Sequence, residues 1–193
     1  MTKNLRVKSS EYIDETNRIS FKFNGKTYHG FKGDTLASAL LANDVHLVGR
    51  SFKYHRPRGI MTSGSEEPNA IIQINPGTNR TEPNVRATEV EIYEGLEASS
   101  QNCWPSVEFD IGGINNFLSP FFPAGFYYKT FMWPASFWEK YEFFIRHSAG
   151  LGKSPTSSDP DIYDHRNIHC DVLVVGAGLS LIHISEPTRL PGI

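Results

Sequence analysis

The chain has 193 residues, enough for one ordinary domain or for a small domain followed by part of another. Hydrophobic residues make up 39% and charged residues 21%, and the formal net charge is -2, so there is no basic excess of the kind that nucleic-acid-binding proteins carry. No apolar run approaches the roughly 20 residues that span a bilayer, and the N-terminus has no apolar signal segment. We therefore predict a cytoplasmic location, with neither nucleic acid nor a membrane as partner.

The first pattern in chain order predicts a β-hairpin. Residues 18–28 alternate apolar and polar side chains on both sides of Asn24-Gly25, the pair that best tolerates positive φ in a two-residue turn. The residues before this hairpin, 1–17, are expected to be an N-terminal extension.

A short helix is expected next, in "GDTLASALLAND". Leu36, Ala39 and Leu40 share one helical face, and Asp34 is placed to cap the first turn. Further short strands are expected in "VHLVGRSF", "AIIQIN" and "TEVEIY". The order of hairpin, helix and strands predicts an α+β fold, with a β-grasp domain over residues 18–95.

An aromatic-rich connecting segment is expected over residues 96–150. Within it, thirteen of the 28 residues from 117 to 144 are aromatic. Three prolines and a glycine divide this stretch into pieces too short to cross a membrane, which favours docking against protein. Residues 151–168 are rich in Gly, Ser, Pro and Asp and are expected to form a linker.

Basic and aromatic residues alternate in "RSFKYHRPRG", residues 50–59. Such a loop can hold phosphates and stack bases. The alternative is that its charges meet carboxylates of the same protein or an anionic cofactor, and we favour this because nothing else in the chain points to nucleic acid.

The loop after it can be compared with the cluster loop of plant-type ferredoxins, which share the β-grasp fold. The ferredoxin spacing C-x4-C-x2-C, started at Thr62, falls on Thr62, Glu67 and Ala70. A [2Fe-2S] cluster needs thiolate donors, and none of these residues is a cysteine. The pattern therefore predicts a ferredoxin-like module that has lost its cluster and serves as a scaffold.

No metal site and no catalytic residue are predicted. The closest pair among the seven histidines is His165 and His169, in a stretch without helical periodicity, and a site needs more converging ligands than two. The two cysteines, Cys103 and Cys170, are not spaced as a disulfide framework or as a metal site.

The strongest chemical signal is "HCDVLVVGAG". Residues 172–175 are apolar on both faces, as a central parallel strand must be. Gly176, Ala177 and Gly178 then supply the first two glycines of G-x-G-x-x-G and are the predicted cofactor-binding residues, although Leu181 stands where the third glycine should be. Residues 169–178 are therefore expected to be the first strand and glycine turn of a truncated, Rossmann-like dinucleotide-binding domain.

These stretches together resemble the N-terminal part of the alpha subunits of heterotetrameric sarcosine oxidases. The motifs that carry the resemblance occur in the family's order: "GDTLASALLAND", "RSFKYHRPRGI", "GSEEPNAIIQI", "PNVRAT", "SQNCWPS", "PAGFYYKTFMWP" and "CDVLVVGAG".

The resemblance implies an oxidoreductase that acts on the CH-NH group of sarcosine with oxygen as acceptor. The products would be glycine, formaldehyde or methylene-tetrahydrofolate, and hydrogen peroxide. It implies NAD in this subunit, FAD and FMN in the complex, tetrahydrofolate as a further candidate, no iron-sulfur cluster, and beta, gamma and delta subunits as partners.

The chain departs from the family after Gly178, where a member would continue "PAGL". "LSLIHISEPTR" instead matches one reading frame of a transposase adaptor used in DNA library preparation. We expect residues 179–193 to derive from that adaptor and the chain to be an N-terminal fragment, inactive alone. The alternatives are a related flavin-dependent amine or opine oxidoreductase subunit, or a stand-alone β-grasp interaction module.

Overall fold

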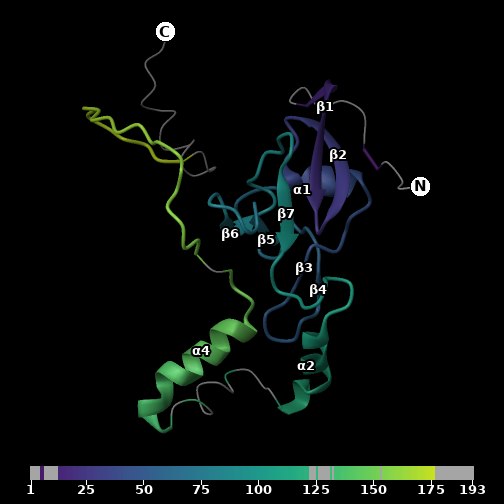
Figure 1. Cartoon of the computed structure of the whole chain (residues 1–193), viewed down its shortest axis with the longest axis vertical. Helices are drawn as coiled ribbons and strands as arrows, with labels where there is room; N and C mark the ends of the chain where they lie inside the picture. The colour runs from purple at the N-terminus through teal and green to yellow at the C-terminus, as the bar shows by residue number, and fades with distance from the viewer. Residues whose placement is uncertain are drawn as a thin grey trace. The chain divides into compact units, whose positions relative to one another are not determined.

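The computed structural model describes residues 5–6, 13–121, 125, 131, 133–152 and 154–176. The chain divides into two compact units, Met1–Pro160 and Asp161–Ile193. Every helix and strand of the described residues belongs to the first unit, and Figure 1 follows them in chain order.

A five-stranded mixed sheet forms the centre of the first unit, in the order β2-β1-β7-β5-β6. Its strands are β1 (Asp14–Phe23), β2 (Lys26–Lys32), β5 (Ile71–Ile74), β6 (Glu82–Arg86) and β7 (Glu97–Ser100). β7 pairs parallel with β1 and antiparallel with β5, so it joins the two antiparallel pairs β1–β2 and β5–β6. A separate two-stranded sheet consists of β3 (Gly49–Arg50) and β4 (Pro57–Arg58).

The predicted hairpin is confirmed as β1 and β2. Asn24 and Gly25 form its turn with φ of 49° and 76°, the left-handed conformation that this pair tolerates. The alternating residues Ile19, Phe21 and Phe23 of β1 are buried, so one face of the hairpin lies on the core.

The predicted helix is confirmed as α1 (Leu36–Ala42), whose residues Leu36, Ala39 and Leu40 are fully buried. They join one hydrophobic cluster with side chains of the sheet, and Figure 1 shows α1 against the sheet. The predicted cap at Asp34 is wrong. Thr35 is the N-cap and accepts a hydrogen bond from the Ser38 amide, because the Asp34 carboxylate accepts from Arg6 and from the Ser38 hydroxyl instead.

The later strand predictions have mixed outcomes. "AIIQIN" contains β5, while "VHLVGRSF" is a strand only at Gly49–Arg50. "TEVEIY" is not a strand: Val90 and Ile92 are buried, but their backbone groups bond to the segment around α1, where Leu36 N–H donates to Val90 O and Ile92 N–H donates to Asp34 O.

Short helices follow the sheet. Among the described residues they are η1 (Ile111–Gly113), α2 (Ile114–Phe117), η2 (Ser119–Phe121), η3 (Ala135–Phe137) and α4 (Trp138–Ser148). None of the helices in the described part of the chain is long and apolar enough to cross a bilayer.

The second unit contains no helix or strand within residues 161–176. The predicted strand at residues 172–175 is therefore not formed in this structure. Its four side chains are between 41% and 76% exposed. A central parallel strand is stabilised by strands paired at both its edges and by helices that cover both its faces, and the described residues of this unit provide neither.

Candidate functional site

Residues 61–70 form a loop whose backbone N–H groups converge on one carboxylate, that of Glu67. Oε2 of Glu67 accepts hydrogen bonds from the amides of Met61 (2.7 Å) and Thr62 (2.6 Å) and from the Thr62 hydroxyl (3.2 Å). Oε1 accepts from the amides of Asn69 (2.7 Å) and Ala70 (3.1 Å). The residue is only 1% exposed, so an acidic side chain is buried with both oxygens satisfied.

The protonation state of Glu67 follows from these contacts. Burial by itself raises the pKa of the carboxyl, but the N–H donors from Thr62, Asn69, Met61 and Ala70 outweigh it and hold the pKa below the ordinary value of 4.5. The side chain is therefore an anion at neutral pH.

The same loop is fixed to the sheet by contacts that do not use the carboxylate. Arg86 Nε donates to the Glu67 carbonyl (3.0 Å), and Thr88 Oγ1 donates to the Gly64 carbonyl (2.8 Å). The Ala87 amide donates to the Ala70 carbonyl (2.9 Å). β6 and the residues after it thus hold the loop in place.

The basic loop predicted from residues 50–59 connects β3 with β4, and part of its charge is used internally. Arg50 donates to the carbonyls of Val107 (2.8 Å), Glu108 (3.0 Å) and His55 (3.2 Å). Nδ1 of His55 lies 2.6 Å from Oδ2 of Asp110, whose side chain is 1% exposed. The interpretation that the loop's charges meet carboxylates of the same protein fits His55 with Asp110, whereas Arg50 bonds to backbone carbonyls instead.

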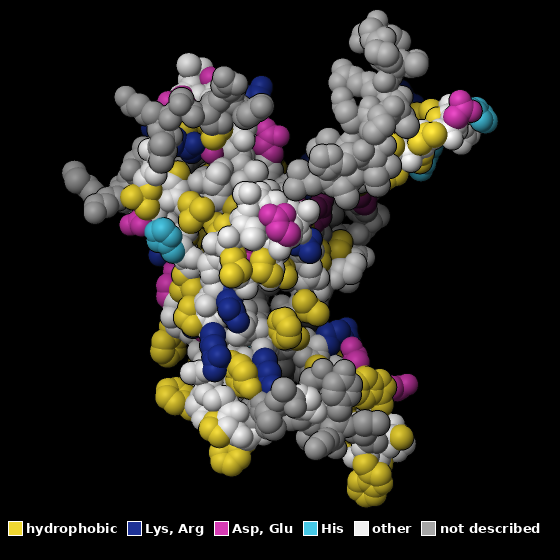
Figure 2. Space-filling view, turned by 180° about the vertical axis from the view of Figure 1, so that it is seen from behind, with side chains coloured by type: hydrophobic (Ala, Val, Ile, Leu, Met, Phe, Trp, Pro, Cys, Tyr) yellow, Lys and Arg dark blue, Asp and Glu magenta, His cyan; other side chains and the backbone are white. Residues whose placement is uncertain are grey.

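The tip of this loop carries an aromatic ring that two cations contact. Lys53 Nζ and Arg56 Cζ lie 4.9 and 4.8 Å from the centroid of the Tyr54 ring. Phe52 beside them is 68% exposed. Figure 2 shows Lys and Arg side chains among hydrophobic ones in the lower half of the view, where β3, β4 and α2 lie.

A small cavity of about 130 Å³ is lined by residues of the β3–β4 loop, by Pro68 and Asn69 at the end of the 61–70 loop, and by residues 84, 101–102 and 149–151. Its polar lining residues include Arg50, Arg58, Asn69, Asn84, Gln101 and Asn102. Guanidinium and carboxamide groups can hold a small polar or anionic group, but the volume is below that of ordinary small-molecule pockets.

The predicted cofactor-binding residues fall at the edge of the described chain. Gly176 is exposed, with φ of 108°, in the glycine-favouring region. Ala177, Gly178 and the predicted adaptor-derived residues lie outside the described residues. His165 and His169 are exposed, and no group of three or more His, Cys, Asp or Glu side chains arranged to hold a metal ion occurs within the described ranges.

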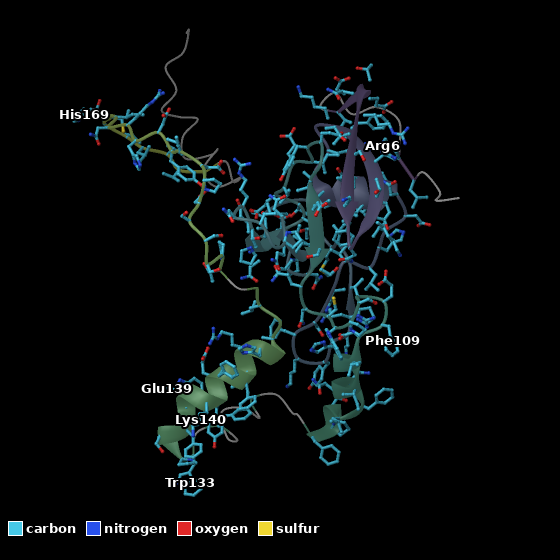
Figure 3. The ribbon with its side chains drawn as sticks, in the orientation of Figure 1. Arg6, Phe109, Trp133, Glu139, Lys140 and His169 are labelled. Atoms are coloured by element: carbon cyan, nitrogen blue, oxygen red, sulfur yellow. The ribbon has the colours of Figure 1, made fainter. Side chains whose placement is uncertain are left out.

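Exposed apolar side chains gather in the segments that follow the sheet. Phe109, Phe117, Phe121 and Trp133 are between 70% and 83% exposed. Figure 3 labels Phe109 on the segment before α2 and Trp133 at the residues before α4, and both rings point away from the chain around them.

Sequence reasoning missed the roles of Glu67, His55 and Asp110. The ferredoxin spacing did single out position 67, but as a residue that is not a thiolate. A glutamate before a proline carries no signal for burial, and His55 and Asp110 are too far apart in the sequence for any spacing rule to pair them.

Residues 16–103 match a family model described as a 2Fe-2S iron-sulfur cluster binding domain. The expected ferredoxin-like domain is confirmed. The expected cofactor set without an iron-sulfur cluster is wrong, because the matched family is one that binds such a cluster. That expectation rested on the residue types at Thr62, Glu67 and Ala70, which supply no thiolate, and three loop positions do not decide the cofactors of a family.

Among solved structures, the crystal structure of L-proline dehydrogenase from P. horikoshii is similar with a TM-score of 0.37 and 22% identity, over 47% of this chain and 16% of that chain. At this score the likeness carries no argument.

Curated relatives are much more similar. The chain is 60% identical over 174 residues to "Sarcosine oxidase subunit alpha" of Rhizobium meliloti (strain 1021), covering 90% of this chain and 18% of the relative. It is 32% identical over 168 residues to the protein of the same name from Corynebacterium sp. (strain U-96), covering 86% of this chain and 12% of that relative. The chain is therefore similar over nearly its whole length to sarcosine oxidase alpha subunits, and it spans less than a fifth of the length of these two relatives.

Proposed function

We propose that this chain is the N-terminal part of a subunit that oxidises the CH-NH group of sarcosine with oxygen as acceptor. The observation that carries the proposal is the 60% identity over 90% of the chain to a protein named as a sarcosine oxidase alpha subunit. The overall reaction converts sarcosine, oxygen and water into glycine, formaldehyde and hydrogen peroxide, with methylene-tetrahydrofolate as the product when tetrahydrofolate accepts the one-carbon unit. A related flavin-dependent amine or opine oxidoreductase is the alternative.

NAD is the proposed ligand of the region that begins at Gly176. A pyrophosphate site needs a glycine turn together with the N-terminus of the following helix, whose free N–H groups and dipole hold the negative charge. In this chain Pro187 disfavours a continuous helix, and Leu181 replaces the glycine that lets helix and strand pack closely. We propose that the native sequence after Gly178 completes the dinucleotide-binding domain and that residues 179–193 are adaptor-derived.

Reading the source gene across the codon for Gly178 tests this origin directly. We expect the gene to encode "PAGL" directly after Gly178 and then to continue in frame over a long stretch. A genomic sequence that encodes "LSLIHISEPTR" at this position would refute the adaptor origin. It would not bear on the proposed activity, which has its own test.

The activity is tested by expressing the natural continuation together with the neighbouring subunits. The extended protein should release hydrogen peroxide with sarcosine and should bind NAD, whereas the 193-residue chain should do neither. If calorimetry gave the 193-residue chain a micromolar dissociation constant for NAD, a binding free energy of about -8 kcal/mol, this would contradict the proposed need for the native sequence after Gly178. An extended complex that oxidises another secondary amine but not sarcosine favours the alternative.

The partners are proposed to be the beta, gamma and delta subunits of a heterotetramer in the cytoplasm. The exposed aromatic side chains before α2 and around α4 support a docking role, because an apolar patch of this kind is rarely left uncovered in a soluble monomer. We expect the backbone amides of α2 and α4 to exchange hydrogen more slowly in the assembled complex than in the isolated chain, because the partner subunits would cover these aromatic side chains.

A further inference from the structure

We infer that residues 61–70 form a carboxylate-binding loop that the chain fills with its own Glu67 side chain. When that side chain is removed, the loop should become a binding site for a free small monocarboxylate such as formate. This inference is independent of the proposed function, because it concerns contacts within the first unit alone.

The first support is the arrangement of the donors. Each carboxylate oxygen of Glu67 accepts from two backbone N–H groups, with the amides of Met61 and Thr62 on one oxygen and those of Asn69 and Ala70 on the other. Two pairs of donors that face opposite oxygens fit a planar carboxylate. A spherical halide would reach only part of this set, because its single centre cannot occupy both oxygen positions.

The second support is that the donors are backbone groups held by other contacts. The loop carbonyls of Glu67, Gly64 and Ala70 are bonded to Arg86, Thr88 and the amide of Ala87. Ile71, which begins β5, is paired with Arg86 of β6. Removing the Glu67 side chain therefore leaves the N–H groups in place but without their acceptor, and unpaired N–H groups favour any anion that restores their hydrogen bonds.

The third support is the contrast in burial between two adjacent acidic side chains. The neighbouring Glu66 is exposed, whereas Glu67 is 1% exposed. Of these two adjacent acidic side chains, Glu66 faces solvent and Glu67 is bound by the loop. The two positions therefore provide a matched pair for an experiment.

The experiment compares the variants Glu67→Gly and Glu66→Gly of the 193-residue chain by thermal unfolding, in sodium formate and in sodium chloride of equal ionic strength. The Glu67→Gly substitution leaves room for a free carboxylate because it removes every side-chain atom. We expect Glu67→Gly to lower the melting temperature by roughly 10 °C in chloride. Formate should raise it again by about 3 °C or more, through binding to the folded state. Glu66→Gly and the wild type should not respond to formate.

A folded Glu67→Gly protein with the same melting temperature in both salts would overturn the inference. If this variant does not fold, amide hydrogen exchange of the wild type decides. The N–H groups of Met61, Thr62, Asn69 and Ala70 should then exchange slowly, and exchange as fast as that of exposed loop amides would equally overturn it.

Discussion

His55 and Asp110 form a partly buried pair that joins the β3–β4 loop to the segment before η1, with Nδ1 and Oδ2 2.6 Å apart. Oδ1 of Asp110 also accepts from the amides of Trp104 (3.0 Å) and Gly112 (3.1 Å). Asp110→Ala would leave the imidazole and two N–H groups without an acceptor, so we expect a loss of about 2–4 kcal/mol in the free energy of unfolding. Urea denaturation measures it. His46→Ala, which removes an exposed pair with Asp44, should change stability by less than about 0.5 kcal/mol. Equal effects of the two substitutions would contradict the role of burial.

Two adjacent glycines allow a matched test of packing against His55. A Cβ added at Gly112 would overlap the imidazole ring of His55, while a Cβ at Gly113 would meet nothing within 4 Å. We expect Gly112→Ala to cost roughly 1–3 kcal/mol because the ring must move. Gly113→Ala should be neutral or slightly stabilising. Chemical denaturation of both variants checks the difference, and a stable Gly112→Ala protein would show that the ring is not held in place.

The buried carboxylate of Glu67 predicts a specific dependence of stability on pH. Its folded-state pKa is lowered, so its contribution to stability is fully present above the unfolded pKa and is lost as the pH falls through the folded pKa. Glu67→Gln should be less stable than the wild type at neutral pH, and the gap should narrow between about pH 6 and about pH 3. Denaturation at a series of pH values measures the gap, and a constant gap would rule out titration of Glu67 as its cause.

Arg6 and Asp34 form an ion pair in which Nη1 lies 3.1 Å from Oδ1 and the Asp34 side chain is fully buried. Arg6→Ala should cost about 1–3 kcal/mol, since Asp34 keeps the Phe31 amide and the Ser38 hydroxyl as donors but loses its counter-charge. Lys22→Ala breaks the exposed pair with Glu97 and should cost less than about 0.5 kcal/mol. Comparable losses for the two would contradict this ranking.

The two cysteines should react at different rates with a thiol reagent. Burial, and secondarily the Asp110 carboxylate, raise the pKa of the Cys103 thiol, so less of the reactive thiolate is present, whereas Cys170 is exposed. At about pH 8 we expect iodoacetamide to modify Cys103 roughly ten times more slowly than Cys170. Mass spectrometry of Cys103→Ser and Cys170→Ser proteins assigns the rates, and the reverse order would contradict the described burial.

The parts of the fold that could be predicted from sequence are those in which local pattern and tertiary contacts agree. The Asn24-Gly25 turn needs no partner elsewhere in the chain, and the apolar face of α1 repeats at helical spacing. β7 has the sequence "EASS", which carries no strand signal. Its central place in the sheet comes from backbone pairing with β1 and β5, which the local sequence does not encode. Val90 and Ile92 show the converse: both are buried, but their segment forms only an isolated bridge, between Glu91 and Thr35, and no strand.

The candidate site was less predictable because its key contacts depend on where loops meet. Glu67 bonds to residues on both sides of itself, and its burial depends on the support that β6 gives the loop. His55 meets Asp110 only after the sheet has placed their segments together. Charge and residue type could suggest that the basic loop finds internal partners, but not which ones.

The position of β7 has a consequence for how this domain forms during synthesis. Lys22 of β1 pairs with Glu97 of β7, so the bond between the two halves of the sheet cannot form until the ribosome has released residues near position 100. Until then β1 has only β2 as a neighbour, and its other edge is open to pairing with another chain. A nascent chain arrested before β7 emerges should therefore be the form that a chaperone protects. The sheet can be completed without a chaperone only after β7 has left the ribosome.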